Sequence, residues 1–305
     1  MCRECDIGRG TFSAMGTTVE ILAPTRLLNR ALSMTENLFR TWEGVLSRFR
    51  PDSELQQLNR QAGRDVPVSD LLWTVAYRAR DAAQATEGWF DFTLGHRLQA
   101  MGYNESWSRL EKESPDSVLL PPLINRGWER VQMDPVHRTI RVPVGVQLDF
   151  GGIAKGMAVD KAVEVLSQEG ITPVLVNAGG DLAVAGVPSS GAWPVAVGEE
   201  MNPVVALHYG ALATSGTSRR RWRRAGVTYH HLLDPRTGYP SRTHVVRATV
   251  WAPTATQADV LAKVALLQGW RAGAAFLETR GSIGELEHED GRIQVIGRWP
   301  ERSRP

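Results

Sequence analysis

A predicted strand and a predicted helix meet in the stretch Leu148-Asp149-Phe150-Gly151-Gly152-Ile153-Ala154-Lys155-Gly156. We expect residues 144–150 to form the strand and the helix to continue to about Ser167. Glycines at this junction let the bare backbone approach a ligand closely, and a helix N-terminus favours an anion. With Asp160 one turn further on, the stretch predicts a phosphate site, part of a cation site, or only a strand-to-helix turn. Its spacing differs from the glycine pattern of dinucleotide-binding folds.

Upstream of this stretch, the pattern indicates a strand followed by helices. Residues 12–22 alternate around β-branched side chains, which predicts a strand. Apolar residues then recur at helical spacing from Leu28 to Phe49, and Ser69 is a typical N-cap for a second helix. Residues 105–122 are polar and end in proline, so we expect an exposed excursion there.

Downstream, strands predominate. We expect strands at 173–177, 182–187, 194–197, 204–208, 228–233 and 245–251, and helices at 256–268 and 271–279. Strands in clusters, without regular βαβ alternation, predict an α+β fold with mixed or antiparallel sheets and packed helices. We expect residues 1–10 to form a disordered tail. Residues 11–305 then form a single domain, or two intimately packed subdomains.

Composition excludes several classes of protein. The 305 residues are 42% hydrophobic and 22% charged, and the formal net charge of +2 gives no case for nucleic-acid binding. The apolar runs are far shorter than the roughly 20 residues that span a bilayer. The first residues carry charges and lead into no apolar segment, so we expect neither a secretory signal nor a lipoprotein cysteine, and a cytoplasmic location. Cys2 and Cys5 are weak indicators of metal or redox chemistry.

A second glycine turn lies in Asn177-Ala178-Gly179-Gly180-Asp181, between two apolar segments. Paired glycines permit positive φ angles, and they can form a backbone nest for anionic oxygens. The same pattern is typical of a tight hairpin. The hairpin is the stronger interpretation of this motif in isolation.

Histidines appear in the segment His230-His231-Leu232-Leu233-Asp234-Pro235-Arg236-Thr237-Gly238. His231, Asp234 and Thr237 suggest a general base, an orienting carboxylate and a hydroxyl. A histidine in a strand also serves structural roles. Metal binding by both histidines is disfavoured, since neighbours on a strand point to opposite faces.

Asp259 and Lys263 stand one turn apart on a predicted helix, so their side chains can meet on one face. An acid in a first helical turn is also a routine partner of the helix dipole.

Taken together, these motifs resemble the FAD:protein FMN transferase (ApbE) family over most of the chain and in the same order. The resemblance rests on Ala14-Met15-Gly16-Thr17, Leu46 to Phe49 with Ser53-Glu54-Leu55 and Asn59, Gly88 to Thr93, Asp149 to Asp160, Asn177 to Asp181, Thr214-Ser215-Gly216, His231 to Gly238, and Ala258-Asp259. It implies an ApbE-like, T-fold-like catalytic domain.

The resemblance also implies a chemistry. FMN is transferred from FAD to a threonine or serine hydroxyl of a partner protein, a redox-complex subunit, and AMP leaves. His231 matches the catalytic histidine, and Gly152 and Asp259 match positions that hold Mg²⁺ against the pyrophosphate. The positions implied to line the FAD site are Met15, Phe49, Trp89, Phe90, Asp91, Asp149, Lys155, Ser215 and Leu233.

Three departures from the family pattern matter. Lys263 stands where the family has a metal-ligating threonine, and Ala262 stands where some members have a second acid. An ammonium group cannot ligate a cation, so we expect a Mg²⁺ site that is weakened or replaced by Lys263. Thr217-Ser218 stands where an aromatic residue is common. The basic run Arg219 to Arg224 is interpreted either as an exposed strand end or as a contact for phosphate or an acidic partner.

Two alternative functions remain at this stage. One is Mg²⁺-dependent hydrolysis of FAD to FMN and AMP, with water in place of the protein acceptor. The other is a flavin-binding protein that has lost metal-dependent turnover.

Overall fold

The computed structural model describes residues 6–198, 204–299 and 302–303. An eight-stranded sheet runs through the molecule, and every neighbouring pair of its strands is antiparallel. In spatial order the strands are β1 (Ile7–Ala14), β2 (Thr17–Pro24), β7 (Val174–Ala178), β8 (Asp181–Ala185), β11 (Gly210–Gly216), β16 (Val245–Ala252), β17 (Ile283–His288) and β18 (Ile293–Ile296).

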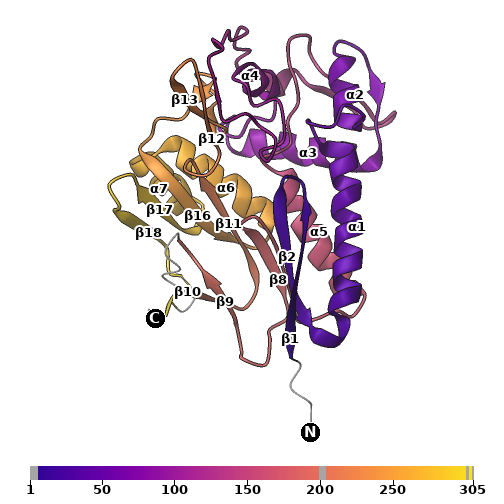
Figure 1. Cartoon of the computed structure of the whole chain (residues 1–305), viewed down its shortest axis with the longest axis vertical. Coiled ribbons are helices and arrows are strands. Elements are labelled where there is room, and N and C mark those ends of the chain that lie inside the picture. Colours follow the sequence, from indigo (N-terminus) through magenta and orange to yellow (C-terminus); the bar gives the residue numbers. More distant parts are fainter. Residues whose placement is uncertain (1–5, 199–203, 300–301, 304–305) are drawn as a thin grey trace.

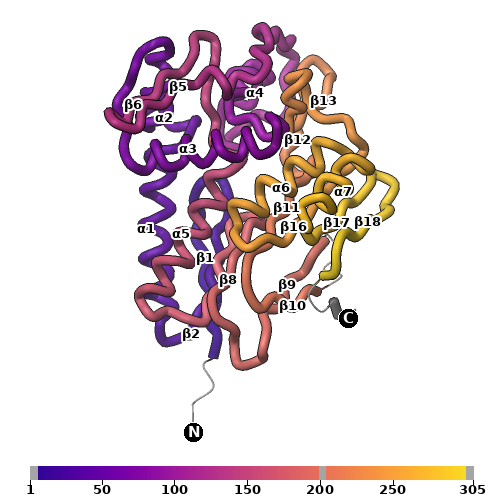
Figure 2. Tube along the Cα trace, turned by 180° about the vertical axis from the view of Figure 1, so that it is seen from behind, coloured from indigo at the N-terminus to yellow at the C-terminus, as the bar shows by residue number. Residues whose placement is uncertain are grey.

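Helices cover one face of this sheet. Figures 1 and 2 show α1 beside α5, and α6 beside α7, each pair against a different part of the sheet. The helices are α1 (Leu28–Leu46), α2 (Glu54–Arg60), α3 (Asp70–Ala85), α4 (Gly95–Ala100), α5 (Ala154–Gln168), α6 (Ala255–Gln268) and α7 (Trp270–Thr279), with 3₁₀ turns at Thr25–Leu27 and Gly127–Arg130.

Small sheets complete the fold. β10 (Val204–Leu207) lies between β9 (Trp193–Ala196) and β19 (Arg302–Ser303) and pairs with both. β12 (Arg221–Arg224) lies between β13 (Val227–His230) and β4 (Glu113–Ser114). The remaining strands are β3 (Val66–Pro67), β5 (Gln132–Asp134), β6 (Thr139–Arg141), β14 (Leu233–Asp234) and β15 (Tyr239–Pro240). The predicted α+β class, with antiparallel sheets and packed helices, is confirmed.

The two faces of the sheet bury different cores. Along β7, Val174 and Val176 face the helices and join the main core, whereas Leu175 joins a second cluster with residues of β9 and β10. This is the period-two alternation of a strand covered on both faces. The main core also includes Leu55 of α2 and Leu72 of α3, so the helices at one end of the molecule share their packing with the sheet.

The structure corrects four boundaries. The strand expected at 12–22 is a hairpin, because Met15 and Gly16 both adopt positive φ angles and form the turn between β1 and β2. β1 begins at Ile7, so residues 7–10 belong to the sheet and not to a tail. Cys2 and Cys5 lie outside the described residues.

The polar segment 105–122 is not simply exposed, since it contributes buried Leu110 and Ser114 and the strand β4. The fourth correction, at 144–150, concerns the site.

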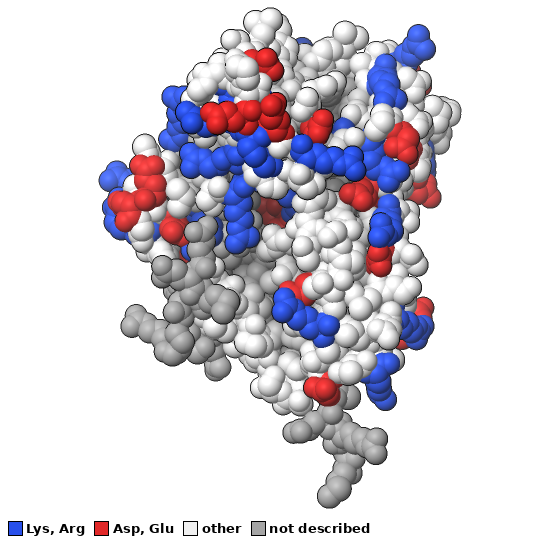
Figure 3. Space-filling view, viewed as in Figure 1, with Lys and Arg blue, Asp and Glu red and all other residues white. Residues whose placement is uncertain are grey.

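Among the described residues, no helix has the length and apolar character needed to cross a bilayer. On the face drawn in Figure 3, a band of basic side chains crosses the upper half, and acidic side chains lie directly beside it. Charge on this face is therefore mixed, in keeping with the small net charge.

Candidate functional site

The segment before α5 is held by a side chain and by single backbone bonds, and not by a strand ladder. Residues 144–150 form no strand, apart from a single bridge between Gln147 and Leu94. The buried Asn59 accepts from the N–H of Leu148 at 2.8 Å and donates to its carbonyl at 3.0 Å. These two bonds satisfy the backbone groups that a neighbouring strand would otherwise pair. On either side, the carbonyl of Gln147 accepts from the N–H of Gly95 at 3.1 Å, and the N–H of Asp149 donates to the carbonyl of Phe92 at 2.8 Å. The expected strand was wrong, because a side chain and single backbone bonds replace a continuous ladder. Asn59 and Phe92 together fix the position of Asp149.

Asp149 is bound on both carboxylate oxygens. Oδ2 pairs with Nε of Arg48 at 2.8 Å, and Oδ1 accepts from the N–H of Gly151 at 2.7 Å. The guanidinium of Arg48 lies 4.1 Å from the ring centre of Phe49 and 4.6 Å from that of Tyr103. Two predicted site residues, Phe49 and Asp149, therefore meet through Arg48, which the sequence analysis did not single out.

Gly152, Asp259 and Lys263 form one cluster. Nζ of Lys263 donates to the carbonyl of Gly152 at 2.8 Å and to Oδ1 of Asp259 at 2.9 Å. The side chains of Lys263 and Asp259 are 16% and 6% exposed, so the pair is largely withdrawn from water. The sequence predicted these three residues at one site, and the structure brings them together.

Asp160 positions this cluster from outside it. Its carboxylate accepts from the N–H groups of Ala255 and Thr256 at 2.7 and 2.9 Å, at the start of α6. Gly156 lets the two helices approach, because a Cβ there would meet the carbonyl oxygen of Ala255 at 2.8 Å. Asp160 therefore holds the N-terminus of α6, on which Asp259 sits, and its carboxylate is already in use as a helix cap.

Lys155 forms a second buried ion pair, with Asp181 at the start of β8. Gly179 and Gly180, both with positive φ angles, make the turn between β7 and β8. The hairpin interpretation of this motif is confirmed. Burial lowers the pKa of Lys155 to about 8; the carboxylate of Asp259 opposes this shift, and the charge of Lys263 adds to it. The two ion pairs therefore lie close enough to interact.

The residues at the family's metal position do not fit a divalent cation. Two of the expected donors, the Gly152 carbonyl and Oδ1 of Asp259, are already bonded to the ammonium of Lys263. The third expected donor is that ammonium itself, which has no lone pair to offer. Oδ2 of Asp259 is buried and has no hydrogen-bond partner among the described residues, so it is the one oxygen of this set that Lys263 does not occupy. Within the same part of the chain, no three His, Cys, Asp or Glu residues are grouped as metal ligands.

His231 follows β13 and is half-buried. Burial holds its pKa well below the usual 6.5, and the positive charges of Arg220, Lys263 and Lys155 act in the same direction. Its Nδ1 atom has no hydrogen-bond partner in the described part of the chain. His231 is therefore a neutral, uncommitted imidazole near the cationic groups of the site.

His230 points elsewhere and has a structural role. It is 7% exposed, and its Nε2 lies 3.0 Å from the carbonyl oxygen of Ser241, to which it donates. The opposite orientation of the two histidines is the one expected for neighbours at a strand.

Asp234 does not orient His231, contrary to one expectation from the sequence. Its carboxylate accepts from the N–H, Nε and Nη2 groups of Arg236 at 2.9, 3.0 and 2.8 Å. Thr237 lies in the same turn, where its N–H donates to the carbonyl of Asp234. The guanidinium of Arg236 also lies 4.0 Å from the ring centre of Trp89. The Asp-Pro-Arg-Thr-Gly turn therefore connects to Trp89 and not to the histidine.

The other predicted flavin-site residues occupy varied environments. Phe90 is buried, with a ring carbon 3.2 Å from the Cβ position of Gly152. Leu233 is buried in a cluster with Tyr103, and Phe49 packs against it. Asp91 accepts from the N–H of Thr93 at 2.8 Å. The N–H of Met15 donates to the carboxylate of Glu43 at 2.9 Å, and Ser215 is buried in β11 opposite Ala248 of β16.

Arg220 is the main residue that the sequence analysis did not place. It belongs to the basic run Arg219 to Arg224, in which Arg221 and Arg223 are exposed and Arg224 is buried. Burial lowers the pKa of His231 and of Lys155, and the charge of Arg220 adds to both shifts. Burial raises the pKa of Tyr103, and the charge of Arg220 opposes that rise. The interpretation as an exposed strand end therefore holds for Arg221 and Arg223. The charge of Arg220 instead acts on the side chains of the site.

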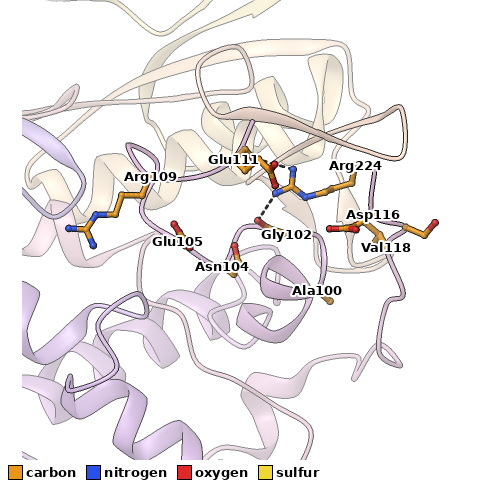
Figure 4. A pocket seen from close by; sticks show the side chains of 10 residues that line it. Ala100, Gly102, Asn104, Glu105, Arg109, Glu111, Asp116, Val118 and Arg224 are labelled. Carbon is orange, nitrogen blue, oxygen red and sulfur yellow. Dashed lines mark hydrogen bonds between the residues drawn. The ribbon is translucent and has the colours of Figure 1, made fainter. Parts of the chain in front are cut away.

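A separate cavity of about 320 Å³ lies between the 100–118 segment and β12. Figure 4 shows Arg224 in its wall, bonded to the carbonyls of Gly102 and Glu111. None of the predicted site residues lines this cavity. It is distinct from the cluster around Lys263.

The fold and sequence match known proteins closely. The ApbE family model matches residues 15–285. A FAD:protein FMN transferase of Treponema pallidum (strain Nichols) is 32% identical over 86% of this chain and 78% of its own length. One of Rhodobacter capsulatus is 30% identical over 94% of this chain and 58% of its own length. The crystal structure of the ApbE protein of Thermotoga maritima superposes with a TM-score of 0.84, at 27% identity, and covers 95% of this chain and 97% of its own. The chain therefore belongs to the ApbE family.

Proposed function

We propose that this chain transfers the FMN moiety of FAD to a threonine or serine hydroxyl of a protein acceptor, with release of AMP. The observation that carries the proposal is the neutral, uncommitted imidazole of His231 beside the buried ammonium groups of Lys155 and Lys263. A general base must be unprotonated to accept a proton, and cations stabilise a pyrophosphate and the charge that develops when it is cleaved. The site provides both. The FAD:protein FMN transferases among its relatives support the same activity.

The reaction follows from these groups. The acceptor oxygen attacks the phosphorus of the FMN moiety and forms a new P–O bond. His231 accepts the proton of that hydroxyl. The P–O bond between the two phosphates of FAD breaks, and AMP leaves with the bridging oxygen. The donors at the family's metal position are bonded to Lys263, so no step is assigned to a metal.

The flavin and adenine rings need flat apolar surfaces and a few hydrogen-bond acceptors. We assign this role to the aromatic side chains of Phe49 and Trp89 and to the carboxylates of Asp91 and Asp149. Arg48 holds Asp149 in place at 2.8 Å. Arg236 covers one face of Trp89, which leaves the other face for a ring. Phe90 and Leu233 are buried behind these groups and shape the wall.

The acceptor is a flavoprotein or a redox-complex subunit that offers an exposed threonine or serine. The test is to incubate the chain with FAD and such a subunit, and with the same subunit carrying valine at the acceptor threonine. Covalent flavin on the first subunit only, with equimolar AMP, is the expected result. Release of free FMN without covalent flavin indicates hydrolysis of FAD instead. Unchanged FAD that is nevertheless bound indicates a flavin-binding protein without turnover.

A further inference from the structure

The ammonium of Lys263 lies where two expected metal donors converge. It donates to the carbonyl of Gly152, just before α5, and to the carboxylate of Asp259 on its own helix, at 2.8 and 2.9 Å. The two donors are 107 positions apart in sequence, so their convergence on one nitrogen is a property of the fold. A lysine on a helix face commonly extends its charge to solvent. This one does not, since its side chain is 16% exposed.

The surroundings are adapted to this ammonium. A Cβ atom on Gly152 would lie 3.1 Å from Nζ and 3.2 Å from Cε of Lys263, so the glycine leaves just enough room for the lysine. Asp259 is 6% exposed and is balanced by the lysine charge. A buried carboxylate without a cation is strongly disfavoured. Lys263 therefore supplies at this position the neutralisation that a bound cation would supply.

A divalent cation would compete with this arrangement. To reach the Gly152 carbonyl and Oδ1 of Asp259, it would have to displace two hydrogen bonds of Lys263 and remain beside the ammonium. The second ammonium, of Lys155, also interacts with Asp259 and Lys263. Like charges in a partly buried site repel one another more strongly than in water.

The lysine retains binding capacity for a substrate. An ammonium group has three N–H donors, and two of them are used by Gly152 and Asp259. The third is available to a phosphate oxygen. Lysine is a common phosphate ligand in proteins, as a compact point charge.

We propose that Lys263 is a built-in replacement for the divalent cation, so that this chain binds the pyrophosphate of FAD and transfers FMN without a divalent metal. The inference rests on the proposed function, since it names how the same site holds the same substrate.

The test compares FAD binding by the full chain in excess Mg²⁺ and in excess EDTA, followed by quenching of flavin fluorescence. For the parent chain, the dissociation constant should differ by less than about twofold between the two conditions. Mn²⁺ alone, titrated and followed by electron paramagnetic resonance, should show no ion bound at this site. Neither measurement on the parent depends on a variant that folds.

Two substitutions sharpen the result. Lys263→Thr offers a hydroxyl ligand in place of the ammonium, so FAD binding should become Mg²⁺-dependent, at least about tenfold weaker in EDTA, and one Mn²⁺ should bind. Lys263→Met keeps the length of the side chain without its charge, and should weaken FAD binding in both conditions. The matched control is Lys161→Thr, which removes an exposed lysine of α5 that pairs with Glu164 and should change neither affinity nor metal dependence.

The outcomes are distinguishable. If the parent binds FAD tightly only when Mg²⁺ is present, the inference is overturned and the proposed function stands. If Lys263→Met binds FAD as the parent does, Lys263 is not the phosphate-binding cation and the inference is likewise overturned. A parent chain that binds FAD in neither condition contradicts the proposed function as well as the inference.

Discussion

Gly152 and Lys263 approach each other so closely that a Cβ atom on Gly152 would lie 3.1 Å from Nζ of the lysine. On its other side, the same Cβ would lie 3.2 Å from a ring carbon of Phe90. Both distances are shorter than ordinary van der Waals contacts. The turn before α5, the lysine of α6 and an aromatic residue of the 89–91 segment are thus packed at one point.

Gly152→Ala should therefore displace the Lys263 ammonium. We expect the dissociation constant for FAD to rise about tenfold, or ~1.4 kcal/mol. We expect the free energy of unfolding to fall by about 1–3 kcal/mol, as in other overpacked sites. Fluorescence titration and denaturant unfolding measure the two effects. Gly44→Ala on α1, where an added Cβ meets nothing within 4 Å, is the control. FAD affinity equal to that of the parent would show that this contact is not needed for binding.

His231→Ala and His230→Ala should have opposite signatures. Loss of the general base should slow flavin transfer by about 10²–10⁴-fold and leave FAD affinity nearly unchanged. His230→Ala instead removes the donor to the Ser241 carbonyl, so it should lower the free energy of unfolding by about 1–3 kcal/mol. The folded His230 variant should retain its transfer rate. Single-turnover rates and unfolding curves for both proteins decide the matter, and a His231 variant as fast as the parent excludes it as the base.

The pH profile of transfer should reflect the depressed pKa of His231. A base acts in its neutral form, and burial together with Arg220, His230, Lys263 and Lys155 holds the pKa of this group well below 6.5. The rate should therefore be flat from pH 6.5 upward on this limb, and should fall only when the pH drops through the lowered pKa. Arg220→Gln removes one of the charges that depress the pKa, so the acid limb should move to higher pH. An acid limb at or above pH 6.5 in the parent contradicts this placement of the base.

The sequence predicts local features of this fold well. The helix expected from Leu28 to Phe49 is present as α1, although it ends at Leu46, and the Ser69 cap of α3 was also expected. Apolar spacing and capping both act within a few residues. The partnership of Asp259 with Lys263 was expected for the same reason, since the two are one helical turn apart. The approach of Gly152 to this pair came only from resemblance to the ApbE family. No pattern in the intervening chain encodes it.

Features that depend on distant partners were missed. Residues 144–150 look like a strand, but the backbone of Leu148 is satisfied by Asn59, 89 positions away, and the groups on either side bond singly to Phe92 and Gly95. Nothing in the sequence distinguishes Arg48 and Arg220 from the many other arginines of this chain. The tertiary fold places Arg48 against Asp149 and the charge of Arg220 near His231. Asp234 looked like an orienting acid, yet Arg236 two residues further on takes its carboxylate. Sequence spacing alone does not determine which of several neighbouring side chains becomes the hydrogen-bond partner of a polar group.

Asn59 anchors the backbone of Leu148, directly before Asp149 of the site, and Asn59→Asp tests this. The amide donates to the Leu148 carbonyl at 3.0 Å and accepts from the Leu148 N–H at 2.8 Å. A carboxylate keeps the acceptor and loses the donor, so a buried oxygen then faces the carbonyl oxygen.

We expect the free energy of unfolding to fall by about 1–3 kcal/mol at pH 7. The loss should be smaller at acidic pH, where a protonated carboxyl group restores the donor. FAD affinity should fall with it, because Asp149 follows Leu148 directly. Asn37→Asp, at an exposed position in the middle of α1, makes the same chemical change without a buried partner and should alter neither quantity. Equal stability of the Asn59 variant and this control would show that the clamp does not hold the segment.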